Sequence, residues 1–347
     1  MQFYTKQHKF YCGIDLHTKN MYLCILNQAG ETLLHKNIKT QRDVFLNVIE
    51  PYMEDIVVAV ECIFTWYWIA DLCAVFSIPF VLGHALYMKA IHGGKAKNDR
   101  IDSYKIAAML RGGMFPLAYV YPSRMRATRD LLRRRTHFVR KRAELFGHIQ
   151  NTRSQYNLMT PIGRMAEPKN RAGVIEIFDN PSVQENIQAD LDMIAAYDTI
   201  IARMELYIST IAKHHDPIAY ALLKTIPGVG RVLGLTLLYE IENIHRFPSV
   251  QNFASYCRLV KCAKESNGKN YGFSGNKIGN PHLKWAFSEA ITCFLKGNEP
   301  AKKYCNRLIN KYGKAKALSI MAHRMGRAVY FMLKNKVPFD QDKFLGH

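Results

Sequence analysis

Four carboxylates have the types and positions that metal-dependent chemistry on a phosphate requires. Asp15 lies within the apolar run Tyr-Cys-Gly-Ile-Asp-Leu, and Glu61 ends the run Ile-Val-Val-Ala-Val-Glu. An ionised carboxylate among such neighbours needs a cation, a hydrogen-bonding partner or a shifted pKa. Asp99 and Asp102 are three residues apart and share one face of an expected helix. Because hard cations prefer oxygen ligands, the four residues predict a site for two Mg²⁺ ions acting on a phosphate substrate.

Each of these carboxylates taken alone also has a structural interpretation. Asp15 could be a turn residue at the end of a strand, and Glu61 a core carboxylate paired with Lys or Arg. Asp99 could be the N-cap of a helix. Their joint placement, at two strand ends and one helix start, favours the metal site.

The elements that position these residues alternate between strand and helix patterns, which predicts a mixed α/β sheet in residues 1–120. A strand pair is expected over 10–26 and single strands elsewhere, separated by helices. The expected single strands are 30–39, 55–62 and 78–83, and the expected helices are 42–53, 66–76 and 101–109.

A second source of chemistry is the polar, glycine-rich stretch 261–280, which is expected to be a loop between helices. Loops of this length in a compact domain are usually functional or disordered. The stretch holds two hydroxyls, Ser266 and Ser274, among lysines and glycines, as a nucleophile that approaches a phosphodiester requires. Because the stretch contains no Gly-x-x-x-x-Gly-Lys-Ser/Thr pattern, ATP use is not indicated.

The net charge indicates a polyanionic partner. The 347 residues include 48 Lys and Arg against 28 Asp and Glu, a formal net charge of +20. A surface this basic repels itself, so nucleic acid or an acidic membrane is the partner it fits. Most of the excess lies in two segments: 124–153 has ten basic and two acidic residues, and 302–336 has ten basic and no acidic ones. Residues 1–120 are nearly balanced in charge.

Residues 121–216 predict a helical arm. The apolar pairs that begin at Leu131, Phe138 and Leu145 recur every seven residues, and apolar residues over 194–211 step by three and four. This is the pattern of an antiparallel coiled coil, although an ordinary helical pair with a solvated face would also produce it. The nearly pure positive sign favours nucleic acid. The candidate contacts are Arg133, Arg134, Arg135, Arg140, Lys141 and Arg142.

Residues 217–347 are expected to form a mainly helical third domain, so that the fold class is α/β plus α. Pro227-Gly-Val-Gly230 between apolar helical segments has the form of a helix-hairpin-helix. In such a turn the backbone N–H groups around Gly228 and Gly230 would face a phosphate. An ordinary helix-helix turn is the alternative.

Composition and local sequence exclude other classes. The most apolar stretch, 57–83, contains Glu61, Asp71 and Pro79, and each acidic residue in a bilayer costs roughly 2.5–3.5 kcal/mol, so we expect no membrane partner. The N-terminal residues do not resemble a signal peptide. Eight cysteines are scattered without a Cys-x-x-Cys pair or matching His spacing, which predicts reduced thiols in a cytoplasmic protein and no zinc site.

Five motifs in order resemble the DEDD transposases of insertion sequences, the "IS one-ten" class, which includes Piv-type DNA invertases and enzymes guided by a bridge RNA. The motifs are Gly13-Ile-Asp15, the strand that ends in Glu61 before an aromatic helix, Lys97-Asn-Asp-Arg-Ile-Asp102, Ile226-Pro-Gly-Val-Gly230, and Glu265-Ser-Asn-Gly with Lys277-Ile-Gly-Asn. The resemblance covers nearly the whole chain. It implies a ribonuclease H-like domain similar to RuvC, a coiled-coil arm and a C-terminal transposase domain.

The resemblance also implies roles for individual residues. Asp15, Glu61, Asp99 and Asp102 match the metal-binding tetrad, and Ser266 matches a catalytic serine. It further implies a phosphoserine intermediate, a guide RNA, donor and target DNA, a dimer or tetramer, and a prokaryotic, nucleoid-associated location. A junction nuclease without a serine nucleophile and a catalytically inactive nucleic-acid-binding protein are the rival functions.

Three positions depart from the family pattern. Cys62-Ile-Phe-Thr-Trp replaces a Thr-Gly pair after Glu61, so we expect a different turn there. Asn267 separates Ser266 from Gly268, which leaves Ser274 as a second candidate nucleophile. Ser103 replaces an Ala after the last Asp, a change that we expect to be harmless.

Overall fold

The computed structural model describes residues 2–92, 98–158, 163–212, 216–274 and 278–346; the side chains of 90–92, 211–212, 262–265, 270 and 273–274 lie outside the described part. The chain divides into two compact units, residues 1–124 and 125–347. The first unit contains the predicted sheet, and the second contains most of the predicted arm together with the helices that follow it. Each unit has its own hydrophobic core.

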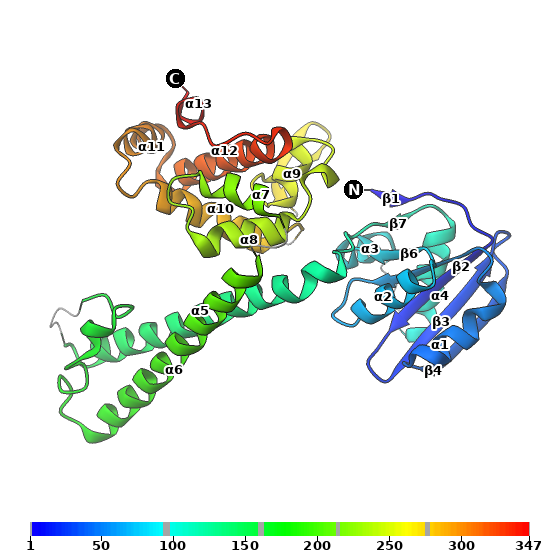
Figure 1. Ribbon diagram of the computed structural model, residues 1–347, viewed down its shortest axis with the longest axis horizontal. Coiled ribbons are helices and arrows are strands. Elements are labelled where there is room, and N and C mark those ends of the chain that lie inside the picture. Colours follow the sequence, from blue (N-terminus) through cyan, green and yellow to red (C-terminus); the bar gives the residue numbers. More distant parts are fainter. Residues whose placement is uncertain (1, 93–97, 159–162, 213–215, 275–277, 347) are drawn as a thin grey trace. The chain divides into compact units, whose positions relative to one another are not determined.

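The strands of the first unit are β1 (Phe3–Tyr4), β2 (Phe10–Leu16), β3 (Asn20–Asn27), β4 (Thr32–Lys39), β5 (Ile56–Glu61), β6 (Phe80–Gly83) and β7 (Phe115–Pro116). Five of them form a sheet in the order β4-β3-β2-β5-β6 (Figure 1). Strands β2 to β4 are an antiparallel meander, whereas β5 and β6 are parallel to β2. The predicted mixed sheet is therefore confirmed.

Helices cover both faces of this sheet. They are α1 (Arg42–Ile49), the short η1 (Glu50–Tyr52), α2 (Tyr67–Val75), α3 (Ala85–His92) and α4 (Asp99–Arg111). Apolar residues of α1 and α2 pack on one face, and those of α3 and α4 pack on the other. The helix α3 was not predicted, and the predicted helix 42–53 is divided into α1 and η1, since Pro51 has no backbone N–H to continue the α-helical bonds.

Close contact between α4 and β2 depends on Gly13. A Cβ atom at Gly13 would lie 2.3 Å from the backbone nitrogen of Ala107 and 2.4 Å from the carbonyl oxygen of Ser103. Both obstacles are backbone atoms of α4, so any larger residue would push the helix away from the strand. Gly13 therefore brings the start of α4 close to Asp15, two residues further along β2.

The second unit begins with two long helices, α5 (Ser123–Gln155) and α6 (Pro181–Ala212). The first two residues of α5, 123–124, belong to the first unit. The helices are antiparallel, because Arg135 contacts Glu205 and His148 contacts Asp190 2.5 Å away. The far end of the pair has its own apolar cluster around Ile149 and Ile194. This is a helical hairpin with the predicted direction, and its classification as a coiled coil stays a prediction.

The remaining helices pack around one large core. They are α7 (Pro217–Lys224), α8 (Arg231–Ile241), η3 (Ile244–Arg246), α9 (Val250–Tyr256), α10 (Pro281–Phe294), α11 (Glu299–Tyr312), α12 (Lys314–Asn335) and α13 (Gln341–Leu345), with η2 (Pro168–Arg171) in the hairpin connection. The predicted mainly helical character of the C-terminal region is confirmed.

The expected loop at 261–280 is wrong in part, because it contains a β-hairpin. Strands β8 (Cys262–Ser266) and β9 (Lys269–Ser274) are antiparallel and pair Ser266 with Lys269. The two residues between them, Asn267 and Gly268, have φ angles of 49° and 69°. Asn-Gly with two left-handed residues is the preferred two-residue hairpin turn. Glycines and polar residues are typical of loops, but an Asn-Gly pair between two extended segments is also a hairpin signal.

Candidate active site

Asp15 and Glu61 end neighbouring strands at the same edge of the sheet. The parallel register of β2 and β5 pairs Ile14 with Val60, so the next residue of each strand is a carboxylate. Adjacent strands are about 4.8 Å apart, and alternate residues share a face. Tyr11 and Val57 have the same parity as the two carboxylates and pack with α4 residues. Asp15 and Glu61 therefore belong to the face that α4 covers.

The first turn of α4 brings two more carboxylates to this face. Asn98 is the N-cap, since its side chain accepts a hydrogen bond from the backbone N–H of Ile101 at 2.8 Å. Asp99 thus occupies the first helical position and is not the N-cap. Acidic residues at this end interact favourably with the helix dipole. Asp102 follows one turn later and lies 3.7 Å from the ammonium of Lys105.

Strand β4 holds the start of α4 in place. The Nε2 atom of His35 lies 2.9 Å from the carbonyl oxygen of Arg100 and 3.2 Å from the hydroxyl of Ser103. The Ser103 hydroxyl also donates to the Arg100 carbonyl at 2.9 Å, and Ser103 is fully buried. A serine in place of alanine at position 103 therefore adds a hydroxyl that has hydrogen-bond partners, and the backbone contact with Gly13 is kept.

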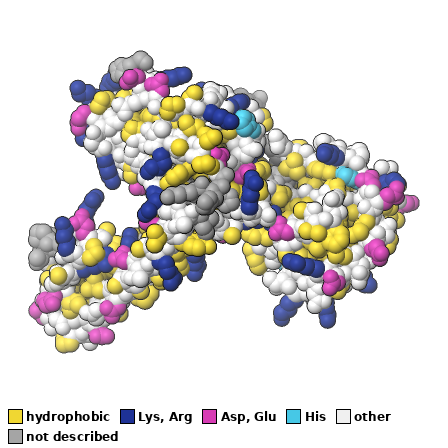
Figure 2. Space-filling view, viewed as in Figure 1, with side chains coloured by type: hydrophobic (Ala, Val, Ile, Leu, Met, Phe, Trp, Pro, Cys, Tyr) yellow, Lys and Arg dark blue, Asp and Glu magenta, His cyan; other side chains and the backbone are white. Residues whose placement is uncertain are grey.

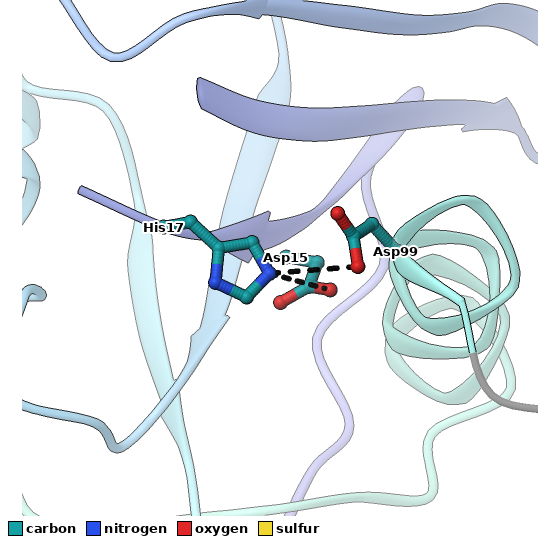
Figure 3. A group of neighbouring side chains, drawn as sticks. All are labelled: Asp15, His17 and Asp99. Atoms are coloured by element: carbon teal, nitrogen blue, oxygen red, sulfur yellow. Dashed lines mark ion pairs between the residues drawn. The ribbon is translucent and has the colours of Figure 1, made fainter. Parts of the chain in front are cut away.

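Asp15 and Asp99 converge with a third side chain, His17 (Figure 3). The His17 Nε2 atom lies 3.4 Å from an oxygen of Asp15 and 3.6 Å from an oxygen of Asp99. One ligand atom from each of the three residues lies within 4.8 Å of the other two. Glu61 and Asp102 belong to the same face but contribute no atom to this group. The structure therefore brings two of the four predicted carboxylates to within metal-binding distance of each other.

The donor set fits a divalent cation. Burial raises the pKa of Asp15; His17 lowers it, while the nearby charges of Asp99 and Asp102 raise it. Several carboxylates held this close repel one another, and a bound cation would relieve the repulsion. Oxygen ligands suit Mg²⁺, and the imidazole of His17 adds a donor that transition metals accept readily.

His17 is the site residue that sequence reasoning missed. It follows Asp15 by two residues, and residues two apart on an extended chain point to the same side. The two-residue spacing from Asp15 could have identified His17 in the sequence. Its backbone is held at the end of β2, because Thr40 donates a hydrogen bond to the His17 carbonyl at 2.9 Å.

The turn after Glu61 is held by hydrogen bonds to two strands. The Cys62 N–H donates to the Gly83 carbonyl at 2.9 Å, and the Thr65 hydroxyl donates to the Leu16 carbonyl at 3.2 Å. The segment is therefore tied to both β6 and β2 without a glycine. Lys97 and Lys277, the first residues of two of the motifs, lie outside the described residues.

Ser266 ends β8 immediately before the hairpin turn and is exposed. The inserted Asn267 is one of the two left-handed turn residues, so the Ser-Asn-Gly order is the one a tight hairpin requires. Ser274 ends β9, and its side chain lies outside the described part. Ser266 belongs to the second unit and the carboxylates belong to the first.

A buried ion-pair network connects the arm to the C-terminal helices. Glu240 on α8 is 2% exposed and accepts hydrogen bonds from Arg129 at 3.0 Å and from Arg133 at 2.6 Å. Asn280 donates to the same carboxylate at 2.7 Å and caps α10 through its side-chain oxygen. Burial by itself would raise the pKa of Glu240, but Arg133, Arg129 and Asn280 lower it to about 2. Arg133, which was predicted to contact nucleic acid, therefore forms an ion pair with a buried carboxylate of the same chain.

Replacing Glu240 with glutamine should destabilise the second unit by about 3–5 kcal/mol near neutral pH, because two arginines would lose their buried counter-charge. The wild-type carboxylate has a lower pKa in the folded state than in the unfolded chain. Its stabilisation is therefore present above about pH 4.5 and is lost as the pH falls toward 2. Urea unfolding at several pH values measures both effects. The exposed Glu185→Gln is the control with the same charge change, and equal stability of the two variants would contradict the assignment.

Other predicted nucleic-acid contacts on the arm also have intramolecular partners. Arg135 forms an ion pair with Glu205, and Arg142 forms one with Asp198. Lys141 lies 2.7 Å from Glu144. The partners of Arg135 and Arg142 are on α6, which has five acidic residues and one basic residue. The charge of α5 is almost purely positive, but the hairpin of α5 and α6 carries charges of both signs.

The exposed residues of this set are Arg134, Arg140 and Lys141. Arg134 lies over the ring of Phe138 at 4.6 Å. Because their charged groups remain accessible, the contact of these three residues with nucleic acid stays a prediction.

Gly228 and Gly230 have different roles in the turn between α7 and α8. Gly228 has a φ angle of 83°, and a Cβ there would lie 2.5 Å from the backbone of Cys293 on α10. Gly230 is the N-cap of α8 and has open space around it, while its N–H donates to the Gly228 carbonyl at 3.1 Å. Gly228 is thus required for packing, and phosphate binding by this turn stays a prediction.

Comparison with known proteins gives matches over both units. Residues 12–157 match a DEDD transposase family model of the IS110 type, described as Transposase, and residues 220–306 match the family described as Transposase IS116/IS110/IS902. The chain is 21% identical over 328 residues to the transposase for insertion sequence element IS1111A of Coxiella burnetii, with 92% of this chain and 88% of that protein aligned. It is 24% identical over 250 residues to "Putative transposase y4qE" of Sinorhizobium fredii, covering 70% of this chain and 59% of that protein.

Membrane insertion has no support from the helices. Within the described residues, none of them combines the length and the apolar character needed to cross a bilayer.

Proposed function

Because the chain belongs to the IS110 family of DEDD transposases and is a DNA transposase, we propose that it cleaves and rejoins the DNA strands of an insertion sequence through a phosphoserine intermediate. The observation that carries the proposal is the convergence of Asp15 and Asp99 at the end of β2. The mixed sheet around them is consistent with a ribonuclease H-like domain. An exposed serine at a hairpin turn supplies a second reactive group.

Asp15 and Asp99 would hold a divalent metal, which we propose to be Mg²⁺, with Glu61 and Asp102 as further carboxylates around it. His17 lies within reach of both aspartates and would orient them. When bound, the metal would neutralise charge on the scissile phosphate and polarise its oxygens. The protein's part is to hold the carboxylates in place before the substrate arrives, through Gly13, His35 and the N-cap Asn98.

Ser266 would be the nucleophile. Its Oγ atom would form a bond to the scissile phosphorus while the bond from phosphorus to the 3′ oxygen breaks. The serine hydroxyl would lose its proton, and the leaving 3′ oxygen would take up a proton to give a free 3′-hydroxyl. A 3′-hydroxyl of the exchanged strand would then attack the phosphoserine and release Ser266. One phosphodiester is broken and one is formed, so no outside energy source is needed.

The oligomeric state and the guide belong to the same proposal. Ser266 and the carboxylates lie in different units of the chain, so a serine from one subunit can serve the carboxylates of another in a dimer or tetramer. The helical hairpin would supply a subunit contact. We propose that a bridge RNA selects the target by base pairing, with the protein binding backbone and shape. Sequencing RNA that co-purifies with the protein tests the guide directly.

Cleavage with and without metal tests the proposed function against its two rivals. The purified protein is incubated with end-labelled donor and target DNA, co-purified RNA and Mg²⁺, and a parallel sample receives EDTA. We expect a covalent protein-DNA adduct with Mg²⁺ and none with EDTA. Cleavage without an adduct would favour a junction nuclease, and binding without cleavage would favour an inactive nucleic-acid-binding protein.

A further inference from the structure

The exposed face of α11 is cationic beyond the first turn of the helix, where Glu299 is its one carboxylate. Ala301 and Cys305 are buried on the opposite face, against the core. The exposed residues of the central turns are Lys302, Lys303, Asn306, Arg307, Asn310 and Lys311. Lys303, Arg307 and Lys311 are four residues apart, so they form one continuous stripe along the helix. The two asparagines between them add amide groups that can donate hydrogen bonds.

These cations differ from those of the arm in how they are neutralised. Ion pairs with carboxylates hold Arg133, Arg135 and Arg142 within the protein. In the described part of α11, the ion pair that forms is between Lys302 and Glu299, 2.5 Å apart at the start of the helix. Lys303, Arg307 and Lys311 thus keep their charge available to an external anion.

The stripe continues into the turn between α11 and α12. The ammonium groups of Lys311 and Lys316 lie 5.2 Å and 4.9 Å from the centre of the exposed Tyr312 ring. Lys314 is exposed between them. An open depression of about 700 Å³ also lies along α11, and it is lined by Glu299, Pro300, Lys303, Asn306, Arg307 and Asn310. Figure 2 shows Lys and Arg side chains that project from the surface of these C-terminal helices.

We propose that the exposed face of α11 and its turn into α12 bind the phosphate backbone of duplex DNA, and that this surface, more than the arm, carries the DNA affinity of the protein. The inference rests on the proposed function, in that a transposase must hold DNA. Duplex DNA is the partner that this enzyme class requires, and a straight stripe of cations with interspersed amides suits its backbone. RNA is the alternative polyanion.

The test measures DNA affinity without cleavage. The full chain carrying Lys303→Gln, Arg307→Gln and Lys311→Gln is titrated with a labelled duplex in EDTA at several salt concentrations. Loss of about three phosphate contacts should lower the affinity by ~10-fold or more and reduce the slope of log K against log salt by about 2 to 3. All three side chains are exposed, so circular dichroism and the unfolding midpoint should match the wild type.

Two triple variants with the same charge change complete the comparison. Arg134→Gln, Arg140→Gln and Lys141→Gln remove the exposed cations of the arm, and Lys6→Gln, Lys36→Gln and Lys39→Gln remove exposed lysines of the first unit. The proposal requires the α11 variant to lose the most affinity.

An equal or larger loss in either of these variants would overturn the proposal, because net charge or the arm would then explain binding. A loss confined to RNA, in a parallel titration with a labelled RNA duplex, would overturn the assignment to DNA. If the wild type binds neither nucleic acid, the proposed function fails together with this inference. If it cleaves DNA but the α11 variant binds normally, only this inference fails.

Discussion

Replacement of Asp15 with asparagine should lower the rate of DNA strand cleavage by about 10³-fold, equivalent to about 4 kcal/mol in the activation free energy. Asparagine keeps the size of the side chain but removes the charge that a cation requires. The Asp15 side chain is 19% exposed and lies next to His17 and Asp99. Single-turnover cleavage of end-labelled donor DNA, at saturating protein and several Mg²⁺ concentrations, measures the loss.

Asp99→Asn should have an effect of the same order, because Asp15 and Asp99 belong to the same group. Asp43→Asn is the matched control: Asp43 is an exposed carboxylate of α1 in the same unit, away from this group. We expect it to cleave at the wild-type rate. DNA binding in EDTA should be unchanged in all three variants. Wild-type cleavage by Asp15→Asn at every metal concentration would sink the assigned metal site.

Ser266→Ala should abolish the covalent protein-DNA adduct entirely and reduce strand exchange to background, because no other group on the alanine side chain can form the phosphoester. The residue is exposed at a tight turn, and alanine needs no new space there, so folding should be unaffected. The measurement is denaturing gel analysis of labelled DNA after incubation with Mg²⁺, in which an adduct migrates with the protein.

Ser274→Ala provides the control within the same hairpin. It should form the adduct at the wild-type level. An adduct that survives in Ser266→Ala and disappears in Ser274→Ala would transfer the nucleophile to Ser274. Cleavage that continues in both variants without any adduct would instead support a nuclease that uses water.

Local periodicity made most of the first unit predictable. The apolar run before Glu61 corresponds to β5, and residues 10–39 correspond to the three strands β2, β3 and β4, because side-chain burial on a sheet repeats every two residues. Helix α3 was missed, since the segment is short and the residue before it, His84, is not one of the usual N-cap types. The hairpin at 262–274 was missed although Asn267-Gly268 carries a strong turn signal.

Electrostatic roles were much less predictable than strands. Arg133 and Arg134 are adjacent in the sequence and identical in type, but the first lies against Glu240 and the second over Phe138. Glu240 is 107 residues away from Arg133. A count of charges within a segment cannot include partners from a distant helix, so it overestimated the free charge of the arm.

The sequence by itself determined that Asp15 and Glu61 lie on strands and that Asp102 lies on a helix, because strand and helix periods are local properties of the chain. It also determined, through the ordered motifs, the family to which the protein belongs. Only the tertiary structure decided that Asp99 reaches Asp15 and that His17 joins them. It also decided that Lys303, Arg307 and Lys311 of α11 stay exposed, while Arg133, Arg135 and Arg142 of the arm form ion pairs. These outcomes depend on contacts between residues far apart in the chain, such as Gly13 with α4, where the absence of one side chain sets the distance between two elements.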